Sequence, residues 1–176
     1  MSEVLTSFPG ARRALFARYH VGGCSSCGFQ PTETLAEVCA RNENLPVDEV
    51  IDHLQTSHEA DLKLEISPRQ LEILLAEALD EDTPLHLVDL RTREEYEAVA
   101  LPGAQLFSQE MMQSAFATWN KNDPVVLYDH SGSRALDAAA YFAGHGFTHV
   151  KALAGGIDRY SLEVDPSLPR YEVEFE

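Results

Sequence analysis

The stretch from Val125 to Arg134 constrains the fold of this chain more than any other. A short apolar run ends at Tyr128 and enters a loop of small polar residues, and an alanine-rich segment follows the loop. A buried strand that opens through a tight loop into a helix start points backbone N–H groups inward, where the helix N-terminus adds partial positive charge. Gly132 allows the close turn, and Arg134 adds a fixed cation. The stretch therefore predicts an anion-binding loop at the end of a strand.

The residues around this loop predict strands and helices in alternation. The expected strands are residues 62–66, 85–90, 106–107, 125–128 and 148–151. The expected helices are residues 68–79, 93–99, 109–119, 134–145 and a short last one after 157. The buried stripe expected in the helix 68–79 is Leu71, Leu74, Leu75, Ala78 and Leu79. Such alternation predicts an α/β fold, a parallel sheet with helices on both faces, and ligands bind such sheets beyond the carboxyl ends of the strands.

The first part of the chain predicts a small all-α domain instead. The expected helices are residues 11–19, ended by Gly22-Gly23, a second begun by a capping box of Thr34 and Glu37, and a third begun by Pro46. The stripe expected in the third helix is Val47, Val50, Ile51 and Leu54. We therefore expect two domains, residues 1–58 and residues 62–176.

Composition limits the functional classes. The chain is 44% hydrophobic and 24% charged, which is typical of a globular protein. A formal net charge of -16 disfavours binding to nucleic acid and to anionic lipid. Long apolar runs and a signal-peptide core are absent from the sequence, so we expect no membrane association and a cytoplasmic location. The 3 cysteines are an odd number, which disfavours a secreted disulfide framework.

Residues 62–164 resemble the rhodanese domain, whose active-site loop has the pattern Cys-x-x-Gly-x-Arg. The supporting segments are Leu87-Val88-Asp89-Leu90-Arg91 with Glu95-Tyr96, Pro102-Gly103-Ala104, the loop of Asp129, His130, Ser131, Gly132, Ser133 and Arg134, and Leu153-Ala154-Gly155-Gly156-Ile157. Two departures stand out. Asp129 occupies the position of the family's nucleophilic cysteine, and Val99-Ala100-Leu101 replaces the usual Gly-His-Ile before Pro-Gly-Ala.

Asp129 decides how the loop is interpreted. A rhodanese cysteine accepts sulfur as a persulfide, which a carboxylate cannot form. We expect the carboxylate to act as a built-in anion, bound by loop amides and paired with Arg134. A nucleophilic Asp129 with His130 as base is the alternative, and the sequence shows no accompanying metal cluster for it. We otherwise expect His130 to face solvent, and Asp89 and Arg91 to bond loops at the sheet edge.

Cys24 and Cys27 form the second candidate site. In a CxxC loop one thiolate attacks and the other resolves the intermediate, which predicts a redox pair. A metal site is the alternative, with zinc or an iron–sulfur cluster held by Cys24, Cys27, Cys39 and His20. Otherwise no cofactor is expected. The helical spacing of Leu35, Val38 and Cys39 instead predicts that Cys39 is a core residue.

Residues 8–56 resemble two related small families in the order of their features: a helix, Gly-Gly-Cys-x-x-Cys, "ETLAEVC" and "LPVDEVIDHL". One is the redox-disulfide domain associated with hybrid-cluster proteins, and the other is the N-terminal domain of the di-iron proteins that repair iron–sulfur clusters. The cysteines of the repair proteins are adjacent, so the Cys-x-x-Cys spacing here lies nearer the redox-disulfide family.

Three hypotheses follow. The first is a catalytically inactive rhodanese-like module fused to a CxxC helical domain, acting in thiol redox or sulfur traffic with a protein partner or a thiol or sulfur carrier. The second is a sulfurtransferase or oxidoreductase whose nucleophile is Cys24 or Cys27. The third is an iron–sulfur or zinc-binding protein.

Overall fold

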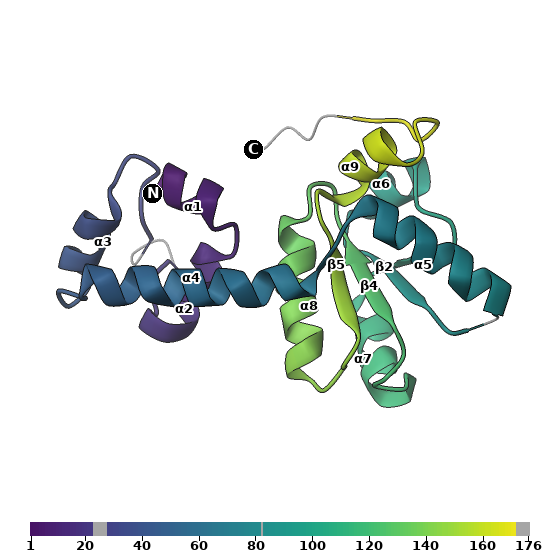
Figure 1. The fold of residues 1–176 in the computed structure, drawn as a ribbon, viewed down its shortest axis with the longest axis horizontal. Coiled ribbons are helices and arrows are strands. Elements are labelled where there is room, and N and C mark those ends of the chain that lie inside the picture. Colours follow the sequence, from purple (N-terminus) through teal and green to yellow (C-terminus); the bar gives the residue numbers. More distant parts are fainter. Residues whose placement is uncertain (23–27, 82, 172–176) are drawn as a thin grey trace. The chain divides into compact units, whose positions relative to one another are not determined.

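The computed structural model describes residues 1–22, 28–81 and 83–171 (Figure 1). The chain divides into two compact units, Met1–Lys63 and Leu64–Glu176. Cys24 and Cys27 lie outside the described residues. Within the described residues, no helix combines the length and the apolar character that crossing a membrane requires.

The first unit is helical. Its helices are α1 (Ser2–Ser7), α2 (Ala11–Tyr19), α3 (Leu35–Arg41) and α4 (Val47–Leu64), whose last residue begins the second unit. The core residues include Leu15, Val21, Val38, Cys39, Val50 and Leu54. These side chains come from α2, α3 and α4 and from Val21, two residues after α2, so each of these helices buries one face.

The helix ends of this unit follow local chemistry. The capping box predicted for α3 is confirmed: Thr34 accepts a hydrogen bond from the Glu37 backbone N–H, and the Glu37 carboxylate accepts one from the Thr34 N–H at 2.8 Å. The predicted span of α2, residues 11–19, is confirmed, but Gly22-Gly23 does not terminate the helix as predicted. The helix ends at Tyr19, because His20 adopts a left-handed conformation (φ 57°) and donates its N–H to the Leu15 and Phe16 carbonyls.

Two predictions for residues 47–66 are also wrong. Ile51 is 36% exposed and does not belong to the buried stripe, which Val50 and Leu54 supply. The strand predicted over 62–66 shrinks to β1 (Glu65–Ile66), because α4 continues through Leu62, which is 52% exposed. An ion pair between the partly exposed Arg13 of α2 and the buried Asp61 joins this last part of α4 to α2, and alternation of apolar residues does not reveal such a contact.

The second unit contains a five-stranded parallel sheet in the order β1-β5-β4-β2-β3, which confirms the predicted α/β class. The other strands are β2 (His86–Asp89), β3 (Gln105–Leu106), β4 (Val125–Tyr128) and β5 (Val150–Leu153). In the register of the two central strands, Asp89 lies beside Tyr128. The carboxyl ends of β2 and β4 therefore meet at one edge of the sheet, where their following loops emerge.

Helices cover both faces of the sheet. They are α5 (Pro68–Glu81), α6 (Arg93–Ala98), α7 (Gln109–Thr118), α8 (Ser133–Gly144) and α9 (Gly156–Glu163). Alternate residues of β4 point to opposite faces: Leu127 packs in the same cluster as Ala135 of α8, whereas Val126 packs in the cluster of Leu71 of α5 and Ile157 of α9. Figure 1 shows α8 beside β4 and β5, and α5 and α9 close together.

The buried stripe of α5 and the start of β5 are among the features of this unit that differ from prediction. The stripe of α5 loses Leu79, which is 84% exposed, whereas Leu71 is fully buried. The last strand begins at Val150 and not at 148, because the Thr148 N–H and hydroxyl both donate to the carbonyl of Lys121.

Candidate functional site

The loop 129–134 joins the carboxyl end of β4 to the first turn of α8, as the sequence pattern predicts. The Asp129 carboxylate accepts a hydrogen bond from the Gly132 N–H at 2.6 Å and a longer one from the Arg134 N–H at 3.3 Å. The residue is 2% exposed. Nε of Arg134 lies 3.5 Å from the same carboxylate, while its side chain remains 58% exposed. A fixed anion thus occupies the amides at the start of α8.

Glycine is required at position 132 by both conformation and space. Gly132 has a φ of 96° and is the residue that precedes α8. A Cβ atom there would lie 2.8 Å from the Gly155 backbone nitrogen and 3.0 Å from the Leu153 carbonyl oxygen. The loop can therefore approach the turn after β5 only with glycine at this position.

The turn before α9 holds the loop from the other side. The Asp129 carbonyl accepts the Ile157 N–H at 3.0 Å, and the His130 carbonyl accepts the Asp158 N–H at 3.2 Å. Gly156 has a φ of 60°, and a Cβ atom there would lie 2.3 Å from the His130 carbonyl oxygen. The first amides of α9 therefore bind loop carbonyls, so the backbone of residues 129–132 is fixed by two helix starts.

The prediction that His130 faces solvent is wrong. His130 is partly buried, and its ring lies 4.7 Å from the ring of Tyr171, centroid to centroid. Its Nδ1 atom is buried and has no hydrogen-bond partner among the described residues. The local sequence could not show this, because Tyr171 comes from the segment after α9.

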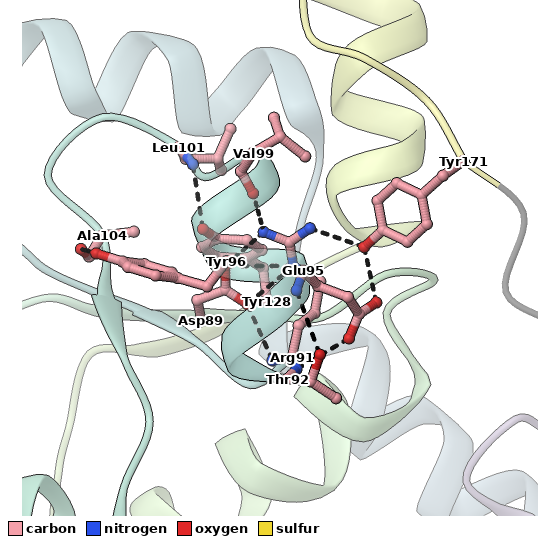
Figure 2. A network of polar contacts seen from close by, with 10 residues as sticks. All are labelled: Asp89, Arg91, Thr92, Glu95, Tyr96, Val99, Leu101, Ala104, Tyr128 and Tyr171. Atoms are coloured by element: carbon pink, nitrogen blue, oxygen red, sulfur yellow. Dashed lines mark hydrogen bonds and ion pairs between the residues drawn. The ribbon is translucent and has the colours of Figure 1, made fainter.

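A second polar cluster follows β2, and Figure 2 shows it from close by. Arg91 and Asp89 form an ion pair with both side chains fully buried, joined by Nε to Oδ1 at 3.0 Å and Nη2 to Oδ2 at 2.6 Å. The Arg91 guanidinium also donates to the Val99 carbonyl. The pair therefore ties the loop after β2 to the end of α6 and contributes no free charge to an external ligand.

Tyr128 extends this cluster to β4. Its hydroxyl accepts the Leu101 N–H at 3.2 Å, and the residue is completely buried. Burial, together with the charge of Asp89, raises the pKa of Tyr128, so the hydroxyl stays protonated at physiological pH. Nearby, the Tyr96 hydroxyl donates to the Ala104 carbonyl at 2.8 Å. These bonds fix the segment that stands where the family has Gly-His-Ile.

The segment after α9 lies over both clusters. The Tyr171 hydroxyl accepts from Nη1 of Arg91 at 2.8 Å and donates to Oε1 of Glu95 at 2.7 Å (Figure 2). Arg170 binds the Asp158 carboxylate through Nε at 2.7 Å and Nη2 at 3.0 Å, which lowers the pKa of Asp158. Sequence reasoning did not single out Arg170 and Tyr171, because they lie beyond the stretch that resembles the rhodanese domain.

Of the residues proposed for the second site, the structure describes Cys39 and His20. Cys39 is 2% exposed in the core of the first unit, and burial raises the pKa of its thiol. His20 ends α2 in a left-handed conformation. The described part of the chain contains no cluster of three or more His, Cys, Asp or Glu residues able to hold a metal ion.

A parallel sheet with a glycine-bent loop between β4 and α8 defines an α/β domain of the rhodanese type. The rhodanese-like domain family matches residues 73–163, and the chain belongs to this family. The match leaves the helices α1 to α4 without an assigned family.

Three known proteins illustrate the likeness. Rhodanese-like/PpiC domain-containing protein 12 of Arabidopsis thaliana, a chloroplastic protein, is 33% identical over 93 residues, which is 48% of this chain and 30% of that protein. The chain thus spans less than a third of that relative. A sulfurtransferase of Allochromatium vinosum is 31% identical over 83 residues, which is 47% of this chain and 78% of that protein. The crystal structure of reduced Bacillus anthracis CoADR-RHD has the same fold, with a TM-score of 0.50 and 14% identity over 70% of this chain and 21% of that chain.

Proposed function

We propose that the rhodanese-like unit has no thiosulfate sulfurtransferase activity. Together with the thiols of Cys24 and Cys27 in the same chain, it acts in thiol redox or sulfur traffic. The observation that carries this proposal is the Asp129 carboxylate. It is 2% exposed and accepts the N–H groups of Gly132 and Arg134, at the family's nucleophile position.

The chemistry of sulfur transfer explains why this substitution matters. A rhodanese thiolate attacks the outer sulfur of thiosulfate, breaks the donor's sulfur–sulfur bond with release of sulfite, and keeps the outer sulfur as a persulfide. A carboxylate has no sulfur with which to form this bond. A doubly charged donor such as thiosulfate would also meet like charge in the loop, because Asp129 already uses the amides that would bind an anion.

The thiols of the first unit supply the chemistry that the loop lacks. Cys24 and Cys27 have the spacing of a redox pair. Cys39 is buried in the core, which disfavours the four-ligand metal site that would need it. The name sulfurtransferase, carried by the Allochromatium relative, supports sulfur traffic as the setting. The partner in this proposal is a protein thiol or a sulfur carrier.

The test compares thiocyanate formation from thiosulfate and cyanide in the natural chain and in Asp129→Cys. We expect background rates for the natural chain. In Asp129→Cys the loop retains Gly132 and Arg134, so incubation with thiosulfate should add one sulfur atom to residue 129, detected by mass spectrometry of the peptide.

Two results would overturn the proposal. A natural rate that is lost in Asp129→Ala would make the carboxylate catalytic. A natural rate that survives in Asp129→Ala and is lost in Cys24→Ala or Cys27→Ala would assign sulfur transfer to the CxxC loop. Ser131→Ala, which changes an exposed residue of the same loop, is the matched control for both comparisons.

A further inference from the structure

A groove of about 490 Å³ lies on the sheet face that carries α5 and α9. Its lining includes Leu75 and Ala78 of α5, Leu85 and Leu87 at β2, and Tyr160 and Asp165 at the end of α9. Leu85 precedes β2, whereas the 129–134 loop follows the carboxyl end of the parallel strand β4. The groove is therefore distinct from the loop site.

The groove has the character of a small-molecule site. Its volume lies within the range of about 300 to 1,000 Å³ that is usual for ligand pockets, which are mostly apolar with a few polar groups. Four leucines line it, two from α5 and two from β2 and the residue before it. Leu79 of α5, which also lines the groove, is 84% exposed and leaves apolar surface at its opening.

Its polar groups lie where α9 ends. Tyr160 is only 7% exposed, and its hydroxyl takes part in no hydrogen bond among the described residues. Asp165 accepts hydrogen bonds from Ser167 through Oδ1, and its Oδ2 accepts none from that part of the chain. Burial raises the pKa of Tyr160, and the negative charges of Glu72 and Asp165 raise it further. An apolar wall thus ends in the hydroxyl of a largely buried tyrosine beside negative charge.

The charge around the groove determines whether it favours a cationic or an anionic ligand. Asp165 is the one lining residue that carries a formal charge at neutral pH among the described residues, and no lysine or arginine joins it. Asp80 and Glu81 on the last turn of α5 are exposed and also negative. A cation is therefore attracted, and an anion is repelled.

We propose that this groove binds a small amphiphile, an apolar chain with one ammonium group. The chain lies against Leu85 and Leu87, and the ammonium group donates hydrogen bonds to the Asp165 carboxylate and the Tyr160 hydroxyl. This site is independent of the function proposed for the loop, so either can fail without the other.

Octylammonium, 1-octanol and octanoate are suitable probes, because they share one chain length and differ in charge. Each is titrated, below its aggregation concentration, into the full chain labelled with ¹⁵N. We expect octylammonium to shift the amide signals of Leu87 and Gly103, which both line the groove, with saturation. Octanol should bind about three- to fivefold more weakly, and octanoate should not saturate.

Variants locate the binding. Asp165→Asn should weaken octylammonium about three- to fivefold and leave octanol unchanged. Asp80→Asn is the matched control, because it removes the same charge from an exposed residue outside the lining. Ala78→Trp fills the groove and should abolish binding of both probes. Retention of the remaining amide signals verifies that each variant is folded.

Several results would overturn the proposal. Equal affinity for octylammonium and octanoate would show that the groove does not select a cation. Equal weakening of octylammonium binding in Asp165→Asn and Asp80→Asn would show that only the net charge of the protein matters and that Asp165 does not contact the ammonium group. Groove signals that respond to protein concentration and to none of the three probes would identify an interface between copies instead.

Discussion

The hydroxyl of Tyr171 accepts a hydrogen bond from Nη1 of Arg91 at 2.8 Å, across 80 residues of sequence. The same hydroxyl donates to Glu95, and the ring of Tyr171 lies against His130. One side chain from the segment after α9 thus touches the loop after β2, the first turn of α6 and the loop that carries Asp129. This contact makes the segment part of the site.

Tyr171→Phe tests the hydroxyl separately from the ring. The change removes one bond from Arg91 and one from Glu95, both of which retain other partners, so we expect the free energy of unfolding to fall by about 1 kcal/mol. Urea denaturation measures it. Tyr141→Phe is the matched control, because Tyr141 is 48% exposed and its contacts are made by the ring. Equal losses in the two variants would contradict the role of the Tyr171 hydroxyl.

Glycine substitutions test how tightly α9 holds the loop. Gly156 and Gly103 both have a positive φ, 60° and 78°. A Cβ atom at 156 would lie 2.4 Å from the Asp129 carbonyl oxygen, whereas at 103 nothing lies within 4 Å. We expect Gly103→Ala to lower the free energy of unfolding by about 1 kcal/mol, because alanine is strained at a positive φ. Gly156→Ala should lower it by at least about 2 kcal/mol more, because the backbone atoms of Asp129 and His130 must move away from the added Cβ atom.

The stabilities of the two variants are compared by their midpoints of denaturant unfolding. The amide NMR signals of Ile157 and Asp158 report whether the hydrogen bonds to the loop change. These amides donate to the Asp129 and His130 carbonyls, so they should shift in Gly156→Ala and stay in place in Gly103→Ala. Equal destabilisation of the two variants would mean that the backbone of the 129–134 loop can move away from residue 156 with little loss of free energy of unfolding.

The sequence predicts those features that depend on neighbouring residues. The path from β4 through the loop to α8 rests on an apolar run, a glycine and a helix start within one stretch. The capping box of Thr34 and Glu37 is equally local, and it forms. The bonds from the Gly132 and Arg134 amides to Asp129 also follow from that stretch, since a short loop before a helix brings these groups together.

Features that depend on distant residues escape the same reasoning. The first three residues of the expected strand 62–66 belong to helix α4, and the buried Asp61 in that helix pairs with Arg13, 48 residues away. The burial of His130 depends on Tyr171, which follows the last helix. Periodicity predicts which side of a helix is apolar, yet Leu79, near the end of α5, is 84% exposed.

The contact of Glu95 with Tyr171 predicts a pH dependence. Burial raises the pKa of the Glu95 carboxyl, but hydrogen bonds from Thr92 and Tyr171 and the charge of Arg91 outweigh it, so the pKa lies below its usual value. A group with a lowered pKa stabilises the folded chain above its unfolded pKa, about 4.3 for glutamate, and loses this contribution as pH falls through the lower folded value.

We therefore expect Glu95→Gln to destabilise the protein most above about pH 5, with the difference shrinking below about pH 4. Urea denaturation at a series of pH values measures this. Glu94→Gln is the matched control, because Glu94 is an exposed neighbour in the same helix turn. A Glu95→Gln difference that does not change with pH would show that the contact does not depend on charge.

The burial of Cys39 predicts that the three cysteines react unequally. The Cys39 thiol is packed in a core with Val38 and Leu54, and burial raises its pKa, so both thiolate formation and access to reagents are suppressed. In the native chain we expect iodoacetamide to modify Cys24 and Cys27 while Cys39 is spared, and all three to react in urea. Cys39→Ala should leave the modification of the other two unchanged.

Glutathione buffers of graded potential then test the pair itself, with the thiols trapped and mapped after equilibration. We expect a disulfide between Cys24 and Cys27 that forms and reopens across the buffered range, because the CxxC spacing lets the two sulfurs meet with little backbone movement. Cys39 should remain a protected thiol throughout, since it is 2% exposed in the core. Three equally reactive thiols would contradict the redox pair. A pair that resists alkylation until a chelator is added would instead identify a metal site, with ligands other than the buried Cys39.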